Sequence, residues 1–150
     1  MRRSEFEIKE ISEIVKIIDK ADTLRLGLND VDVPYIVPLS YGYEVVNENI
    51  IIYIHGASEG KKHDLINKSS KAFIEIDIFN GYIKTPGSLS CKFESIMAQG
   101  NLIKIEGSEA VKGLNLIVNH CGYENYKFEG CFNGCEVYKI KLENISCKKR

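Results

Sequence analysis

The stretch 53–62 holds the residues of this chain whose types and spacing best suit a chemical role. A β-branched and aromatic run, 50–54, leads into a Gly/Ser turn that ends in Lys61 and Lys62, where a helix is predicted to begin. Free backbone N–H groups at a helix start, lysine side chains and the Ser58 hydroxyl together suit a phosphate group. The spacing fits neither the Walker loop nor the dinucleotide Gly-x-Gly-x-x-Gly pattern, so the sequence predicts a phosphate site of another kind.

Some side chains in this stretch also allow simpler interpretations. His55 at a strand end could be an ordinary surface histidine, and Ser58 could cap the helix whether or not a ligand binds. Lys61 and Lys62, however, lie in the first helical turn, where the helix dipole favours acidic residues. Two cations at this place are easier to explain if an anion binds there.

The composition of the 150 residues argues against several classes of protein. The net charge of −1 gives no global attraction for nucleic acid or for an acidic membrane surface. No apolar run approaches the ~18 residues of a membrane span. Glu5, Glu7, Lys9 and Glu10 would interrupt the apolar core of a signal peptide. We therefore expect a cytoplasmic protein that binds neither nucleic acid nor membrane.

The five cysteines, at 91, 121, 131, 135 and 147, are an odd number and do not suggest a disulfide framework. Cys131 and Cys135, with His120 and Cys121 upstream, raise the question of zinc. Their spacing is not the tight Cys-x-x-Cys pair, and nearby glycines suggest an ordinary turn. Reduced, partly buried thiols and no metal site are therefore the expectation.

Apolar periodicity predicts about six strands and three helical segments. The strands are expected over 23–28, 34–43, 50–55, 71–79, 91–106 and 136–142, with helices over 12–21, 61–68 and 108–122 and a loop around 81–87. Ser12 and Ser108 are candidate N-caps. Pro34 and Pro38 place the second strand at a sheet edge, or where ladder bonds give way to something else. Short antiparallel strands with few helices indicate a mainly β protein with peripheral helices, a single domain over 1–150 built as a small closed or split barrel.

Four segments share their order and pattern with a known family. They are Pro34-Tyr35-Ile36-Val37-Pro38-Leu39-Ser40-Tyr41-Gly42-Tyr43, Ile52-Tyr53-Ile54-His55-Gly56-Ala57-Ser58-Glu59-Gly60-Lys61-Lys62, Lys92-Phe93-Glu94-Ser95-Ile96-Met97-Ala98-Gln99-Gly100 and Val137-Tyr138-Lys139-Ile140. Together they resemble the pyridoxamine 5′-phosphate oxidase-like split barrels, and within these the nitroimidazole-resistance (NimA-like) branch. The resemblance spans nearly the whole chain and implies a six-stranded antiparallel split β-barrel of the FMN-binding type.

The resemblance also implies a homodimer with FMN bound in clefts at the dimer interface. The residues that would lie along the isoalloxazine ring are Val37, Pro38, Leu39 and Ser40. Because the backbone there would turn to a ligand, the missing donor of Pro38 would cost little. His55, the implied catalytic residue, and Gly56 would lie near the ring or the ribityl chain, and Ser95 would reach the cofactor from its own strand. Lys62, with Lys61 and Ser58, would hold the phosphate by charge-assisted hydrogen bonds.

The implied chemistry is electron transfer through FMN to a small-molecule acceptor, with NAD(P)H or another donor reloading the flavin. The acceptor could be a nitroimidazole, another nitro compound or a quinone. The chain departs from the family at Gln99, at Ser146-Cys147-Lys148 and in having no tryptophan, which leaves the substrate contacts open. Two alternatives remain: a non-catalytic flavin carrier or sensor, and a haem-binding split barrel that uses His55, His63 or His120.

Overall fold

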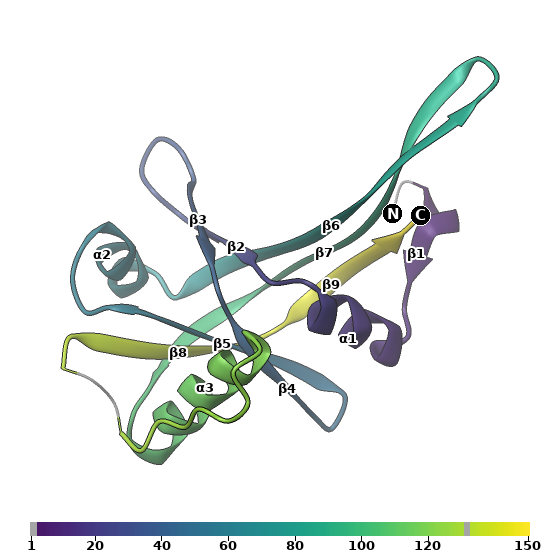
Figure 1. Ribbon diagram of the computed structural model, residues 1–150. Helices are drawn as coiled ribbons and strands as arrows, with labels where there is room; N and C mark the ends of the chain where they lie inside the picture. Colours follow the sequence, from purple (N-terminus) through teal and green to yellow (C-terminus); the bar gives the residue numbers. More distant parts are fainter. Residues whose placement is uncertain (1–2, 131–132) are drawn as a thin grey trace.

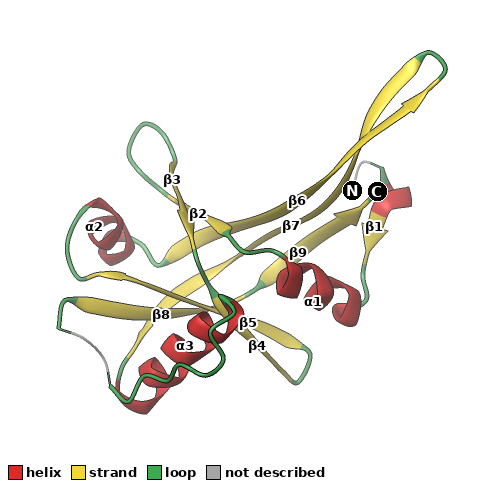
Figure 2. Cartoon of the chain, viewed as in Figure 1, coloured by secondary structure: helices red, strands yellow, loops and turns green. Residues whose placement is uncertain are grey.

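The computed structural model describes residues 3–130 and 133–150, and in this part of the chain strands predominate (Figure 1). The strands are β1 (Glu7–Ile8), β2 (Leu24–Leu28), β3 (Tyr35–Leu39), β4 (Gly42–Val46), β5 (Asn49–Ala57), β6 (Lys71–Thr85), β7 (Ser88–Ile105), β8 (Cys135–Lys141) and β9 (Glu143–Lys149). The helices are α1 (Ile11–Lys20), α2 (Lys61–Lys68) and α3 (Gly107–His120), preceded by a short 3-10 turn (Ser4–Phe6). Figure 2 shows the strands forming the body of the molecule, with the three helices at its margins. The predicted fold class, mainly β with peripheral helices, is confirmed.

One long strand, β7, belongs to both halves of the barrel. The strands pair in the order β3-β2-β6-β7-β8-β5-β4, and every pair given for the described residues is antiparallel. The first part of β7 also pairs with β9, from Glu94 to Gln99, and its last part pairs with β8, from Leu102 to Ile105. β7 therefore carries the chain from one half-sheet into the other, as a split barrel requires.

The predicted strand over 34–43 is in fact two strands, β3 and β4, which form the two ends of this order. The chain turns between them because Tyr41 is buried, with its hydroxyl donating to the carbonyls of Ile18 at 2.6 Å and Ala21 at 2.8 Å. Pro38 lies in β3, which among the described residues pairs with β2 alone, so the edge strand, one of the two places predicted for Pro38, is the one found.

Both predicted serine caps are wrong. The N-cap positions of α1 and α3 are Glu10 and Glu106, one residue before the helices begin at Ile11 and Gly107. Both acidic residues have extended backbones, and neither makes a side-chain capping bond. Helix propensity and backbone geometry, rather than a hydroxyl cap, therefore set these helix starts.

The predicted loop over 81–87 is confirmed for the turn at Pro86 and Gly87 and wrong for 81–85, which belong to β6. β6 and β7 continue past a register shift between Phe79 and Tyr82 and pair again as far as Thr85 and Ser88. Gly81 has a φ of 93°, which glycine adopts without steric cost, so it allows the irregularity without ending the strand. The result is a two-stranded arm that projects from the body (Figure 1).

Two apolar clusters stabilise the fold. The main one fills the barrel and includes Ile17, Ile18, Leu24, Leu26, Ile52, Ile54, Ile74, Ile76, Ile96 and Ile140. The second lies between α3 and the β5–β8 pair and includes Tyr53, Leu114, Ile117 and Val137. At Gly42 the backbone of α3 comes so close that an added Cβ would lie 2.4 Å from Ile117 N. Among the described residues, no helix is both long and apolar enough to cross a membrane.

Candidate functional site

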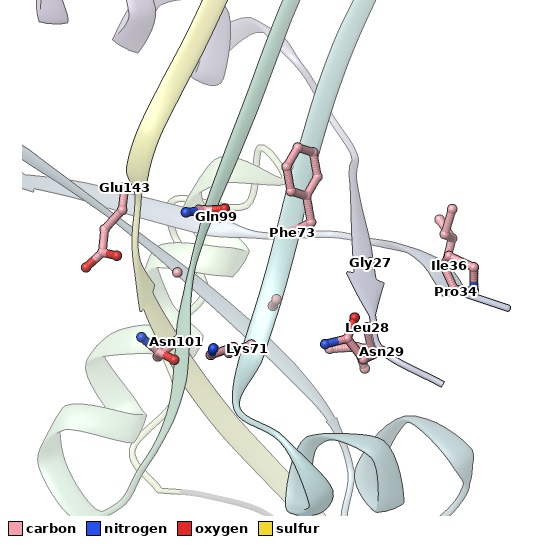
Figure 3. Close-up of a pocket in the computed structure, with 12 residues that line it drawn as sticks. Gly27, Leu28, Asn29, Pro34, Ile36, Lys71, Phe73, Gln99, Asn101 and Glu143 are labelled. Atoms are coloured by element: carbon pink, nitrogen blue, oxygen red, sulfur yellow. The ribbon is translucent and has the colours of Figure 1, made fainter. Parts of the chain in front are cut away.

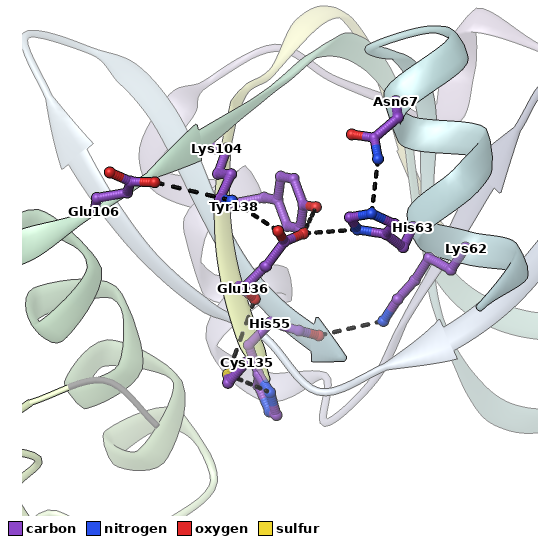
Figure 4. Close-up of polar contacts among 9 residues, drawn as sticks. All are labelled: His55, Lys62, His63, Asn67, Lys104, Glu106, Cys135, Glu136 and Tyr138. Atoms are coloured by element: carbon purple, nitrogen blue, oxygen red, sulfur yellow. Dashed lines mark hydrogen bonds and ion pairs between the residues drawn. The ribbon is translucent and has the colours of Figure 1, made fainter. Parts of the chain in front are cut away.

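The predicted phosphate-binding stretch lies where β5 ends and α2 begins. Lys62 bends back from the first turn of α2, and its ammonium group donates to the His55 carbonyl at 3.3 Å (Figure 4). A Cβ added to Gly56 would lie 2.2 Å from the Lys62 Nζ and 2.7 Å from its Cε. The bare backbone of Gly56 is therefore what allows the ammonium group to lie against the strand.

The two neighbouring lysines have different surroundings. Lys61 pairs with Asp30 at 2.8 Å and lies over the Tyr35 ring, 5.3 Å from its centroid, so it turns toward the β2–β3 side. Lys62 is half-buried, and it forms no ion pair with any carboxylate of the described residues. Burial lowers the pKa of Lys62 below its ordinary value, because the charged form loses hydration, and the nearby Cys135 thiol offsets this loss only in part.

The His55 ring faces away from the Lys62 ammonium group. Successive residues of a strand point to opposite faces, and the ring of His55 lies on the side of α3, with its Nδ1 4.0 Å from the Sγ of Cys135. Partial burial, and then the charge of Lys62, lower the pKa of His55, so the ring is neutral at pH 7. The structure thus brings the carbonyl of His55, and not its imidazole, to Lys62.

A small apolar cavity of about 320 Å³ adjoins the His55 ring. It lies between the end of β5 and α3, and its lining includes Leu114, Ile117, Val118, Phe128 and Cys135. Such a lining suits a small ring compound, with the imidazole as a polar group at its margin.

A buried carboxylate, Glu136, was not singled out by the sequence analysis. It accepts hydrogen bonds from Lys104 at 2.7 Å, from the Tyr138 hydroxyl and from His63 Nδ1 at 2.8 Å (Figure 4). These bonds, that of Lys104 foremost, lower the pKa of Glu136 to about 2. The sequence feature that could have indicated Glu136 is an acidic residue at a position of β8 whose neighbours on the same face are apolar or aromatic. A buried acidic residue at such a position needs hydrogen-bond partners.

The four predicted ring-contacting residues form the outer strand β3 and the corner after it. Val37 and Leu39 point inward and pack against the barrel core, whereas Pro38 and Ser40 are exposed. The start of α2, which follows β5 in the chain, also contacts β3, because Lys61 lies over the Tyr35 ring at the start of β3.

Among the described residues, neither Ser58 nor Ser95 forms a hydrogen bond with Lys62. The backbone N–H of Ser58 donates to the Gly134 carbonyl at 2.9 Å, and the N-cap position of α2 is Gly60, so Ser58 is not the cap. Ser95 lies opposite Asp77 and Lys148 on the outer face of β7, with β2 and β6 between it and β3. Within one chain, Ser95 is therefore apart from the other predicted residues.

A larger hollow, of about 570 Å³, lies on the outer face of the sheet and is lined by none of the predicted site residues (Figure 3). Gly27 forms its floor between Ile36 and Phe73, its neighbours in the same rung of the sheet. Lys71, Asn101 and Glu143 are among the polar residues around it.

The rings of His63 and His120, two of the three histidines, form hydrogen bonds or pack against another ring. His63 bonds to Glu136 and Asn67, and His120 bonds to the Ile18 carbonyl and packs on Tyr41 at 4.4 Å between ring centroids. No three potential metal ligands converge among the described residues. Cys131, part of the zinc motif considered above, lies outside the described residues.

Known proteins with this fold include flavin- and haem-binding examples. A candidate 5-nitroimidazole antibiotic resistance protein from Bacteroides thetaiotaomicron is 26% identical, with a TM-score of 0.81 over 95% of this chain and 85% of that chain. A flavocytochrome from Azotobacter vinelandii is 18% identical, with a TM-score of 0.80 over 100% and 72% of the two chains. An FAD- and haem-binding protein from Mycobacterium smegmatis is 12% identical, with a TM-score of 0.79 over 95% and 72%. A comparison with curated proteins gave no match.

A family model that matches nearly the full length of the chain shows which family it belongs to. The model of the family described as pyridoxamine 5′-phosphate oxidase matches residues 10–149, from α1 to the end of β9. This range contains every predicted site residue, and it confirms the resemblance inferred from the sequence. The chain therefore belongs to the pyridoxamine 5′-phosphate oxidase family.

Proposed function

We propose that this protein binds FMN and uses it to reduce small oxidised compounds such as nitroimidazoles, other nitro compounds or quinones. The observation that carries the proposal is the state of Lys62. Its half-buried ammonium group lies on the bare backbone of Gly56, in the first turn of α2, and forms no ion pair with a carboxylate of the described residues. A cation with these surroundings gains from a bound anion, and a phosphate would supply it.

The outer strand β3 supports a flavin rather than a simple phosphate compound. In the part of the chain that the structure describes, β3 pairs on one side only, so its other side offers backbone N–H and C=O groups to the polar edge of a planar ring. Val37, Pro38, Leu39 and Ser40 would provide this edge, and Lys62, with Lys61 at longer range, would hold the phosphate. Bound FMN would supply the redox chemistry, and NAD(P)H is a suitable donor to reload it. The family match and the flavin-binding proteins that share the fold support this assignment.

We further propose that the protein is a cytoplasmic homodimer with the cofactor at the subunit interface. Ser95 is on the outer face, so it could contact a flavin only if a second copy covered that face. Ile36, Phe73 and Met97 lie on the same face with exposed fractions of 63%, 46% and 39%, which suits an interface. Native mass spectrometry should give a flavin-loaded dimer, and a stable flavin-loaded monomer would contradict this arrangement.

The test of the cofactor is the absorption spectrum of the purified protein, with mass spectrometry of what it releases on heating. We expect flavin bands and the mass of FMN. A Soret band would instead favour haem held by His55, the histidine whose ring carries the fewest contacts among the described residues. Haem is the second candidate because two proteins with this fold are named as a flavocytochrome and an FAD- and haem-binding protein.

The test of the reaction is anaerobic stopped-flow spectroscopy. If the protein is a reductase, NAD(P)H bleaches the flavin, and a nitroimidazole or quinone restores the colour of flavin that NAD(P)H or dithionite has reduced. If neither NAD(P)H bleaching nor acceptor-driven reoxidation occurs, the protein is a flavin carrier or sensor.

A further inference from the structure

The β5–β8 ladder places Gly56 directly opposite Glu136. Side chains of directly paired residues share one face of a sheet, so Glu136 and the bare Cβ position of Gly56 are neighbours. Two consecutive residues of α2, Lys62 and His63, contact this one pair of opposite residues. Lys62 lies over Gly56, and His63 bonds to Glu136 at 2.8 Å (Figure 4).

The hydrogen bonds that Glu136 accepts from side chains of the described residues come from Lys104, Tyr138 and His63, and not from Lys62. One carboxylate oxygen accepts from Lys104 at 2.7 Å, and the other accepts from Tyr138 and His63. With 9% exposure the residue is buried, and the bonds from these three donors keep it ionised. The carboxylate next to Lys62 thus holds His63 without neutralising the lysine.

His63 is fixed from both sides of its ring. Asn67, one turn further along α2, lies with its Nδ2 2.8 Å from His63 Nε2. An amide N–H donates, so in this arrangement Nε2 accepts and the proton of a neutral ring is on Nδ1, where it donates to Glu136. The ring therefore connects the third residue of α2 to β8 in one orientation.

We propose that Glu136 and His63 are positioning residues that hold the Lys62 ammonium group against Gly56, ready for a phosphate. The identity of that phosphate rests on the proposed function, whereas the position of Lys62 does not. The pair acts through the backbone between residues 62 and 63. A rotation of α2 that released His63 would also withdraw Lys62 from the strand.

The first test needs no flavin. The pKa of Lys62 is measured by NMR titration of its ¹³Cε resonance in wild type, His63→Leu and His63→Asn. Leucine removes the bond and leaves Glu136 charged, so Lys62 should move into solvent and its pKa should rise toward the ordinary value. Asparagine can place an N–H where His63 has Nδ1, so it should keep the wild-type pKa. An unchanged pKa in His63→Leu would overturn the proposal.

Asp30→Asn provides the matched control. Asp30 also contacts α2, through an ion pair of 2.8 Å between its carboxylate and the Lys61 ammonium group. This variant should leave the Lys62 pKa unchanged. If it raises the pKa as much as His63→Leu does, the effect is a general loosening of α2 and the proposed pairing is wrong. Thermal unfolding of each variant shows that the folded form is being compared. If His63→Leu does not fold, His63→Met, which has no N–H donor, replaces it.

The second test compares FMN with riboflavin, which lacks the phosphate. If Lys62 is positioned for a phosphate, His63→Leu should reduce the preference for FMN over riboflavin at least tenfold, and His63→Asn should restore it. An equal loss for both ligands would mean a merely structural role and refute the proposal. If the wild type binds neither ligand, the proposed flavin function fails, and the NMR titration still decides the position of Lys62.

Discussion

Replacing Lys62 by methionine gives the most direct measure of the proposed phosphate contact. Methionine keeps an unbranched chain of similar length and removes the charge, so Gly56 stays covered and the fold keeps its packing. One charge-assisted hydrogen bond contributes ~1.5–3 kcal/mol. At ~1.4 kcal/mol per factor of ten, Lys62→Met should weaken FMN binding by about 10- to 150-fold.

The same substitution should stabilise the protein when no ligand is bound. Because the folded-state pKa of Lys62 is lowered, folding at neutral pH must hold the charged amine in an environment that disfavours it. This cost is complete below the folded-state pKa and disappears as the pH rises past the ordinary value of ~10.4. The ligand-free methionine variant should therefore unfold at a higher urea concentration than wild type at pH 7, and the difference should vanish at alkaline pH.

The assay is quenching of flavin fluorescence, titrated with FMN and with riboflavin, together with urea unfolding of the ligand-free proteins. Lys61→Met is the matched control, because Lys61 is already paired with Asp30, and it should change the FMN affinity much less. An unchanged FMN affinity in Lys62→Met, or an equal loss of riboflavin, would refute the phosphate assignment. A ligand-free variant less stable than wild type would refute the reasoning about its charge.

Five further substitutions test the surrounding geometry. Gly56→Ala should lower FMN affinity about tenfold with little loss of stability, since its Cβ displaces only the flexible end of the lysine above it; isothermal titration and a thermal melt check both. Gly42→Ala should cost ~1–3 kcal/mol or more in urea unfolding, because its Cβ would meet helix backbone at 2.4 Å, whereas Gly27→Ala, with its nearest contact at 3.5 Å, should be nearly neutral. The carboxylate of Glu136, whose pKa is lowered to about 2, adds stability that is complete above its ordinary pKa and lost as the pH falls toward 2; the stability difference from Glu136→Gln should therefore shrink over that range. His55→Ala should retain FMN, since only its carbonyl reaches the lysine, and should slow turnover in the stopped-flow assay.

The local pattern of the sequence was sufficient for most of the strands and helices. Leu24, Leu26 and Leu28 alternate with less buried residues, as the predicted strand over 23–28 requires, and Ile74 and Ile76 do the same in β6. The break between β3 and β4 was not predictable in this way. Its cause is the bond from the Tyr41 hydroxyl to the end of α1, which depends on how distant segments pack.

The chemistry of the site was predictable by residue type and not by contact. Lys61 and Lys62 look equivalent in the sequence, and Asp30 in a distant loop decides which of them is paired. The sequence indicates His63 only as a possible haem ligand. Its partner Glu136 is 73 residues away, and nothing near His63 in the sequence indicates that contact. Ser95 was predicted to join these residues at the cofactor, but it lies on the outer face of β7, with β2 and β6 between it and β3.

The arm formed by β6 and β7 means that a single strand takes part in two separate opening equilibria. Around Ile74 and Ile96 the backbone lies between paired strands above a buried core, so its amide protons should exchange with solvent only when the whole barrel unfolds. Beyond Tyr82, where β6 and β7 pair only with each other in the described residues and Tyr82 and Leu89 are about two-thirds exposed, the ribbon can open while the barrel stays intact. Hydrogen exchange along β7 should therefore change from fast to slow within one unbroken strand, and the position of that change marks where the cooperative unit of the barrel ends.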